Sequence, residues 1–345
     1  MIQSQFAISI VLLGLTTNIF AAEGEASKQD DKLLNECIAQ QAAIVEEETT
    51  IKTLREICRS INQQTSSDSN EKDELSPLEE RLKNERATRD NPAVITPHKR
   101  NYILPISYVD NPNGEPFRAI NEDFELDNFE AKFQLSFKAP VAESLIKDED
   151  VLFFGFTIQS YWQMYNSDVS SPFRETNYQP EFFYGFTNDL EVGEWRNLVN
   201  LIGIEHQSNG RSQPLSRSWN RLYAQIVWEN NNWLFMFKPW YRLPEKEKTE
   251  PNQPDGDDNP DIGDYMGFFE FSTHYQWDDQ TFSMMLRNNL RSENNRGAIQ
   301  LDWTFPMGKR FKGYAELFHG YGESLIDYNH KTTRLGIGVL LTDVF

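Results

Sequence analysis

LVNLIGIEHQSNGRSQPLSRSWNRLYAQIVW, residues 198–228, contains two segments in which apolar side chains recur at every second position. In a β-strand, successive side chains point to opposite faces. In the first half, one face carries Leu198, Ile202, Ile204, His206 and Ser208. In the second half, one face carries Asn220, Leu222, Ala224, Ile226 and Trp228. The connection NGRSQPLSR is polar and contains Gly and Pro, so the stretch predicts an antiparallel hairpin.

Three polar side chains fall on the apolar face of this predicted hairpin. If His206 pairs with Asn220, then His206, Ser208 and Asn220 are neighbours. A serine hydroxyl attacks an ester only when a base within hydrogen-bond reach takes its proton. An amide oxygen facing the imidazole accepts from the other ring nitrogen and fixes the tautomer. We therefore predict a Ser-His-Asn triad, and its place on an apolar face favours a lipid substrate.

The backbone beside this triad supplies candidate donors for an oxyanion. A tetrahedral intermediate needs hydrogen-bond donors aimed at its negative oxygen. The N–H groups of Ser208 and Gly210 are the candidates, because glycine permits the close approach that such a hole requires.

Strand-like alternation continues through the chain from His98 onward. The predicted strands are 99–109, 130–138, 150–164, 179–188, 197–208, 218–229, 232–243, 264–277, 280–291, 297–306, 310–321 and 332–345. Their number is even, and a tilted strand needs about 9–11 residues to span a membrane. The fold class predicted is all-β, a 12-stranded antiparallel transmembrane β-barrel with an N-terminal helical extension.

The connections between these segments alternate in length. Segments 229–232, 277–280 and 306–310 are short, whereas 209–217, 244–263 and 322–331 are long and polar. Short turns on one rim and long loops on the other are typical of an outer-membrane barrel, with the catalytic hairpin's loop on the extracellular side. A soluble β-sandwich is the alternative, but it does not explain charged residues opposite the apolar face.

Composition agrees with this class and excludes others. The 345 residues carry a net charge of −20 and a mean hydropathy of −0.63, and after the N-terminus no run is long and apolar enough for a transmembrane helix. A transmembrane β-barrel contains no long apolar run, because only alternate residues of each strand contact lipid. The acidic balance argues against a nucleic-acid partner.

The N-terminal part has a different character from the predicted barrel domain, residues 98–345. Residues 1–22 are typical of a signal peptide, with cleavage after Ala21 or Ala22. Residues 23–97 are predicted to form a helical and partly disordered extension, with a solvated linker from about 62 to 91 and a short helix at 78–86. The extension is either a spacer or partner-docking arm, or a structured subdomain.

The two cysteines lie in this extension. Cys37 and Cys58 are equidistant from the acidic cluster at Glu47 and Glu48, so folding two helical stretches into an antiparallel pair brings them level. An extracytoplasmic compartment favours oxidation. We predict a disulfide; the alternative is two unpaired thiols in a longer coiled coil.

Four blocks of this sequence resemble the outer-membrane phospholipase A family. They are HQSNGRSQPLSRSWNRLY at 206–223, SSPFRETNY at 170–178, DDNPDI at 257–262 and GYGESLIDYN at 320–329. The resemblance runs in colinear order from about His98 to Phe345. It implies a twelve-stranded barrel in the Gram-negative outer membrane. It also implies an enzyme that hydrolyses both acyl esters of phospholipids, and those of lysophospholipids, with a Ser-His-Asn triad. By the same resemblance, the enzyme requires calcium and is active as a dimer. The alternating last strand, which ends in Phe345, resembles the signal read by outer-membrane assembly machinery.

The same resemblance implies the calcium ligands. They are the Arg211 carbonyl, Ser216 and, from a second subunit, Ser170. A second calcium site in the family uses two acids. Asp258 matches one of them, whereas Gln213 replaces the other. The sequence therefore leaves two alternatives, a second site that is retained and one that is lost. The remaining acids Asp255 and Asp261 are interpreted as parts of a solvated loop.

Dimerisation in the family also involves a membrane-buried glutamine. The matching region here reads Ile158-Gln159, so the polar contact is either lost or shifted by one residue. Two functional alternatives remain at this point: a non-catalytic porin or structural barrel, and a catalytically dead family member that acts through its N-terminal arm. The triad on the apolar face argues against both.

Overall fold

The computed structural model describes residues 75–89, 91, 94–250, 253, 255–308 and 311–344. Its helices are α3 (Pro77–Thr88), α4 (Glu115–Arg118) and α5 (Ile262–Met266). Its strands are β1 (Thr96–Pro97), β2 (Asn101–Asp110), β3 (Phe129–Glu143), β4 (Val151–Trp162), β5 (Phe173–Val192), β6 (Trp195–Ser208), β7 (Ser218–Asn230), β8 (Trp233–Leu243), β9 (Phe269–Trp277), β10 (Gln280–Asn288), β11 (Gly297–Met307), β12 (Phe311–Tyr321) and β13 (Lys331–Thr342).

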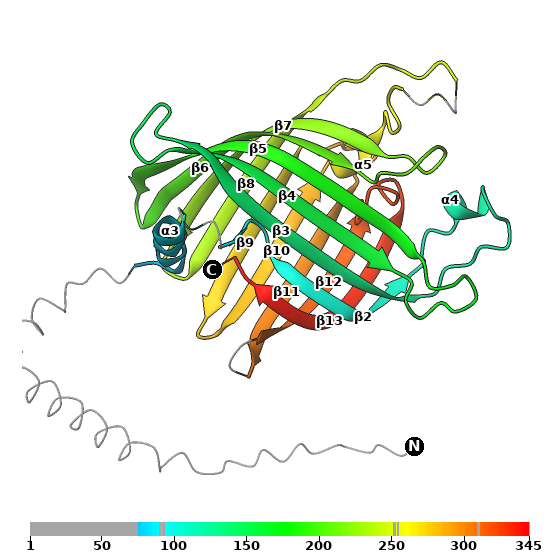
Figure 1. Cartoon of the computed structure of the whole chain (residues 1–345), viewed down its shortest axis with the longest axis horizontal. Helices are drawn as coiled ribbons and strands as arrows, with labels where there is room; N and C mark the ends of the chain where they lie inside the picture. Colours follow the sequence, from blue (N-terminus) through cyan, green and yellow to red (C-terminus); the bar gives the residue numbers. More distant parts are fainter. Residues whose placement is uncertain are drawn as a thin grey trace, which may run out of the picture. The chain divides into compact units, whose positions relative to one another are not determined.

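Strands β2 to β13 form a closed antiparallel barrel (Figure 1). Each strand pairs with its sequence neighbours, and β13 pairs with β2 to close the sheet. The two-residue β1 adds a short pairing to β3. Closure satisfies every strand edge, which is what a sheet in a bilayer requires. The predicted twelve-stranded barrel is confirmed.

Alternation gives the barrel two chemically different faces. Large apolar side chains point outward and are exposed: Leu135, Phe137, Ile202, Ile204, Leu222, Ile226, Leu335 and Ile337. Charged side chains point inward and are buried: Glu130, Lys132, Arg174, Glu205, Arg221, Glu316 and Arg334. An apolar exterior around a polar interior is the pattern of a barrel that spans a membrane.

Buried ion pairs inside the lumen link strands that are not neighbours in the sheet. Glu130 receives Arg174 at 3.0 Å and Arg334 at 2.5 Å, and Lys132 Nζ lies 2.6 Å from Glu316 Oε1. Charges out of water are stable only when they are paired in this way. These ion pairs form a charged network inside the lumen that links β3 with β5, β12 and β13.

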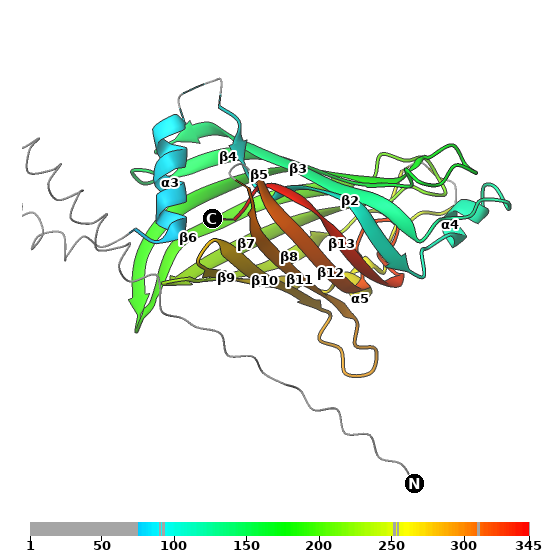
Figure 2. The ribbon, with the colours of Figure 1, turned by 90° about the horizontal axis from the view of Figure 1, so that it is seen from below.

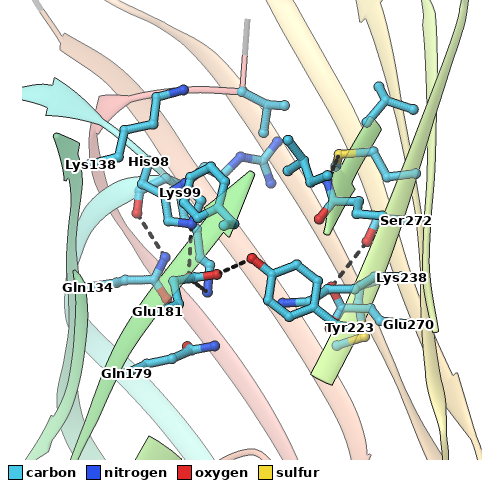
Figure 3. Close-up of a pocket in the computed structure, with 18 of the residues that line it drawn as sticks. His98, Lys99, Gln134, Lys138, Gln179, Glu181, Tyr223, Lys238, Glu270 and Ser272 are labelled. Atoms are coloured by element: carbon cyan, nitrogen blue, oxygen red, sulfur yellow. Dashed lines mark hydrogen bonds and ion pairs between the residues drawn. The ribbon is translucent and has the colours of Figure 1, made fainter. Parts of the chain in front are cut away.

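A cavity of about 460 Å³ remains inside the barrel (Figure 3). Glu181 lies at its centre, where it accepts from the Tyr223 hydroxyl at 2.6 Å and contacts His98 Nε2 at 2.9 Å. Lys99 approaches the same carboxylate at 3.2 Å. His206, Ser208 and Asn220 are not among the residues that line it, so the cavity is separate from the predicted triad.

The loops and turns sort to opposite ends of the barrel. The long-loop rim consists of residues 111–128, 163–172, 209–217, 244–268, 289–296 and 322–330. The short-turn rim consists of residues 144–150, 193–194, 231–232, 278–279 and the β11–β12 connection. α4 and α5 lie at the long-loop rim (Figure 1). The predicted alternation of short and long connections is confirmed.

Helix α3 lies across the end of the barrel at the short-turn rim (Figure 2). Ser76 and Glu79 form its capping box. Leu78 packs on the buried Leu198, Val227 and Leu234. The predicted short helix is confirmed, and it buries an apolar side chain against the barrel, so this part of the predicted linker is not fully solvated. Residues 62–74 of the predicted linker lie outside the described residues, and for them the linker stays a prediction. The expectation that Leu198 shares the outward face with Ile202 is wrong, because a register shift between Asn197 and Val199 interrupts the alternation of β6.

Several predicted strand boundaries are also wrong, and β3 runs to Glu143, five residues past the predicted 138. β5 begins at Phe173, six residues before the predicted 179. The alternation is hidden there because Arg174, Glu175 and Asn177 are buried in the lumen. β9 begins at Phe269, because the residues before it form the turn of helix α5.

The predicted signal peptide and the predicted Cys37–Cys58 disulfide lie outside the described residues and stay predictions. Within the described part of the chain, none of the helices has the length and apolar character needed to cross a membrane.

Candidate active site

The β6–β7 hairpin places His206 directly opposite Asn220 and Ser208 opposite Ser218. Asn209 N–H donates to the Arg217 carbonyl, whereas Ser218 N–H donates away from β6 to Asn259 Oδ1. By the alternation of an antiparallel ladder, His206 and Asn220 form a non-hydrogen-bonded pair, the type with the closest side chains. The predicted pairing is confirmed.

His206 Nδ1 and Asn220 Oδ1 lie 2.9 Å apart. Asn220 Nδ2 donates to Glu245 Oε1 at 3.1 Å, and this bond identifies the other amide atom as oxygen. An amide oxygen only accepts, so the imidazole proton is on Nδ1 and the lone pair is on Nε2. His206 Nε2 is therefore free to serve as a base on the side of Ser208.

Ser208 is two residues from His206 on the same strand face. Its hydroxyl forms no hydrogen bond within the described part of the chain. Catalytic hydrogen bonds often tighten only when substrate is bound. His206, Ser208 and Asn220 are half-buried among outward-facing apolar side chains, including Ile204 and Leu222, both about half exposed at 49% and 48%. The three residues thus share the lipid-facing surface of the barrel.

Gly210 follows Ser208 at the start of the loop 209–217. Its φ is +63°, a conformation that favours glycine, and an added Cβ would lie 3.3 Å from the Tyr178 ring. Its N–H forms no hydrogen bond in the ranges that the structure describes. A free backbone donor two residues after the serine is consistent with the predicted oxyanion role.

The predicted calcium ligands are partly brought together. Ser216 Oγ donates to Asp258 Oδ2 at 2.6 Å, and Gln213 Nε2 donates to Asp258 Oδ1 at 2.6 Å. Arg211 lies in the same loop, and its guanidinium donates to the carbonyls of Phe173 and Arg174. Ser170 is exposed in the neighbouring loop 163–172, with φ +61°.

The chemistry of this donor set fits a hard cation of modest affinity. Calcium takes carbonyl, hydroxyl and water oxygens as well as carboxylates. Because Ser216 gives its proton to Asp258, its lone pairs are available, and the Arg211 carbonyl accepts no hydrogen bond within the described residues. The structure's described part holds no group of three or more His, Cys, Asp or Glu side chains suited to a metal. The Ser216 hydroxyl and the Arg211 carbonyl are therefore the groups that fit a calcium ion here.

Lys248 adds a cation that the sequence did not point to. Its ammonium group forms an ion pair with Asp258 Oδ1, and both side chains are largely buried. Asp258 therefore already has three partners: Lys248, Gln213 and Ser216. A calcium ion bound at this carboxylate would have to compete with the ammonium group.

The DDNPDI block is bonded to β8, to the start of β7 and to the loop 322–330. Asp257 receives the Arg242 guanidinium at 2.6 Å, and Asn259 Oδ1 accepts from Ser218 N–H at 3.1 Å. Asp261 Oδ1 accepts from the Tyr328 hydroxyl at 2.7 Å. The interpretation of Asp261 as part of a solvated loop is thus wrong. Asp255 is exposed, as expected.

Gln159 points into the lumen. Its amide donates to the Tyr102 hydroxyl at 3.1 Å, and its oxygen accepts from the Tyr161 hydroxyl at 3.0 Å. It is therefore unavailable as a polar group on the lipid-facing surface, and a dimer of this chain cannot use it there.

Sequence reasoning missed Glu245 and Lys248, although a signal for the first is present. β8 pairs Leu243 with Asn220, so two residues further on Glu245 has the same strand parity. For Lys248 no local pattern exists, because its contact with Asp258 depends on how the segment 244–268 folds back.

Comparisons with known proteins identify the family of the chain. A family model described as Phospholipase A1 matches residues 78–341. "Phospholipase A1" of Klebsiella pneumoniae is 39% identical over 256 residues, 74% of this chain and 85% of that protein. "Putative phospholipase A1" of Neisseria meningitidis serogroup B is 40% identical over 260 residues, covering 72% of this chain and 66% of that protein.

Solved structures give the same result. Outer membrane phospholipase A from Escherichia coli matches with a TM-score of 0.67 and 39% identity, covering 74% of this chain and 95% of that chain. A Salmonella typhi outer membrane phospholipase dimer with bound calcium matches with a TM-score of 0.67 and 38% identity, covering 74% and 94%. Fold and site together define an outer-membrane β-barrel phospholipase. The chain belongs to the phospholipase A1 family.

Proposed function

We propose that this protein is a calcium-dependent phospholipase that hydrolyses the sn-1 and sn-2 acyl esters of phospholipids, and lysophospholipids, at Ser208. The observation that carries the proposal is the 2.9 Å contact between His206 Nδ1 and Asn220 Oδ1, beside Ser208 on the lipid-facing surface. Membership of the family supports the substrate class. Against a porin stand the buried ion pairs inside the lumen.

The reaction follows from the hydrogen-bond order. Ser208 Oγ attacks the acyl carbon while His206 Nε2 takes its proton, and Asn220 holds the resulting imidazolium through Nδ1. The N–H groups of Ser208 and Gly210 receive the oxyanion. When the intermediate collapses, the glycerol oxygen leaves with the proton from His206. A water molecule then repeats the sequence on the acyl-enzyme and releases the fatty acid.

The Arg211 carbonyl, Ser216 and Ser170 of a second subunit would hold the calcium ion. Calcium bound there would polarise water beside the oxyanion. Ser170 is exposed in the loop 163–172, which neighbours the loop that carries Arg211 and Ser216. This position supports a calcium site shared between two subunits. A second barrel against the catalytic hairpin also turns a convex apolar wall into a groove for an acyl chain. The long-loop rim would then face the cell exterior, after insertion by outer-membrane assembly machinery that reads the final strand.

We expect calcium to convert an inactive monomer into an active dimer. Crosslinking in detergent, titrated with calcium beside the fatty-acid release assay, should give crosslinked dimer and activity with the same half-saturating concentration. The Ser170→Ala variant should need more calcium for both signals, whereas Ser167→Ala, in the same loop and also exposed, should behave like the wild type. Full activity from a species that stays monomeric at saturating calcium would contradict this part of the proposal.

Lys248 should weaken calcium binding, because its ammonium group neutralises Asp258 next to Ser216. We expect Lys248→Met to bind calcium several-fold more tightly, since removing one nearby positive charge favours a divalent cation by roughly 1 kcal/mol. Isothermal titration calorimetry measures this without reference to turnover. Lys246→Met, which removes an exposed lysine of the same segment, is the matched control. Equal affinities for wild type and Lys248→Met would show that the ammonium group and the ion do not compete.

A further inference from the structure

We propose that Glu245 is a positioning residue that extends the triad to a fourth member. Its carboxylate accepts from Asn220 Nδ2 at 3.1 Å, and Asn220 Oδ1 in turn lies 2.9 Å from His206 Nδ1. The inference rests on the proposed function of Ser208, His206 and Asn220. It adds a residue from a third segment, the connection that leaves β8 at the long-loop rim (Figure 1).

Glu245 fixes the orientation of the Asn220 amide. An asparagine side chain can turn over and exchange its oxygen with its nitrogen. If Asn220 turned over, Nδ2 would face His206, and the imidazole could no longer donate from Nδ1. A carboxylate accepts only, so Glu245 selects the orientation in which the amide oxygen faces His206.

The charge of Glu245 also acts on His206. A neutral asparagine stabilises an imidazolium less than an aspartate does. Glu245 supplies a negative charge one hydrogen-bonded group further away, and the amide between them carries its effect to the ring. The site therefore gains part of the benefit of a carboxylate without placing one in direct contact with His206 at the lipid boundary, where desolvation is costly.

Glu245 is held near Asn220 by strand β8. β8 pairs Leu243 with Asn220, and the chain continues from there to Glu245. Glu245 is half-buried. The pKa of Glu245 is raised, first by burial and then by the carboxylates of Asp257 and Asp258. The hydrogen bond from Asn220 and the Arg242 guanidinium act in the other direction and lower that pKa. Of these groups, Arg242 is itself paired with Asp257.

The experiment compares Glu245→Gln, Asn220→Ala and their combination in the full-length protein, with saturating calcium and mixed micelles of phosphatidylcholine and detergent. We expect Glu245→Gln to lower kcat roughly 5- to 10-fold while KM changes less than about twofold, since a hydrogen bond to a charged group is lost from the relay. Glu245→Asp, which keeps the charge on a shorter side chain, should recover part of kcat. Glu247→Gln, an exposed neutralisation two residues away, should match the wild type.

Two readouts separate positioning from a structural role. Removing the charge disfavours the imidazolium, so the acidic limb of the kcat/KM profile should move to lower pH in Glu245→Gln. In the Asn220→Ala background, Glu245→Gln should change kcat less than about twofold, because the relay is already broken. An equal loss in both backgrounds, or an unshifted acidic limb, would overturn the inference. Turnover that survives Ser208→Ala would instead refute the proposed function, so the two failures are distinguishable.

Discussion

Ser208→Ala is expected to lower fatty-acid release by a factor of about 10³ or more, with the protein still folded and inserted, because the atom that forms the acyl-enzyme bond is removed. His206→Ala should have a comparable effect, since without the base the hydroxyl keeps its proton. Asn220→Ala should leave measurable activity, because Asn220 orients His206 at 2.9 Å and makes no bond to substrate. Initial rates in mixed micelles, with folding checked by heat-dependent gel mobility, measure all three.

The matched control for this series is Ser212→Ala. Ser212 is an exposed serine in the same loop, 209–217, and has no role in the proposed reaction. Its rate should equal that of the wild type. Near-normal turnover by correctly inserted Ser208→Ala protein would show that the triad assignment is wrong.

The second large effect is on stability and concerns Glu130. This buried carboxylate receives two guanidinium groups, from Arg174 at 3.0 Å and from Arg334 at 2.5 Å, and the Gln163 amide at 2.8 Å. Glu130→Gln leaves two buried positive charges with one fewer counter-charge. Breaking a buried pair in this way costs about 3–5 kcal/mol. We expect urea unfolding in lipid vesicles, followed by tryptophan fluorescence, to show a loss of that size.

Glu149→Gln is the control for Glu130→Gln. Glu149 also pairs with an arginine, Arg86, at 3.2 Å, but the two side chains are 60% and 42% exposed. An exposed pair contributes about 0–1 kcal/mol, so its unfolding midpoint should stay close to that of the wild type. Equal midpoints for the two variants would mean that the lumen charges are solvated and that the network does not stabilise the barrel.

The sequence was sufficient for the barrel and for the hairpin that carries the triad. Strand parity alone put His206 and Asn220 on the outer face with Ile204 and Leu222, and the β6–β7 register agrees. This works because the two environments, lipid and lumen, impose opposite polarity on alternate residues. Parity failed at the start of β5, where polar residues that face the lumen looked like a loop.

The parts that could not be predicted depend on contacts between distant segments. The ion pair of Lys248 with Asp258 and the packing of Leu78 on β6, β7 and β8 have no local sequence pattern. Local propensity predicts the α3 helix but says nothing about what its apolar side chain covers. Glu245 lies between these cases, since the position of β8 beside Asn220 brings it near the triad once the register is known.

The central claim is that Ser208 hydrolyses phospholipid esters in a calcium-dependent reaction at the outer surface of the barrel. The most direct test is fatty-acid release from mixed phospholipid micelles by the wild type, measured with calcium and again after chelation, beside Ser208→Ala. We expect rapid release that stops on chelation, returns when calcium is restored, and is absent from the Ser208→Ala protein at every calcium concentration. Release that persists in chelator, or the same release from Ser208→Ala and wild type, would contradict the claim.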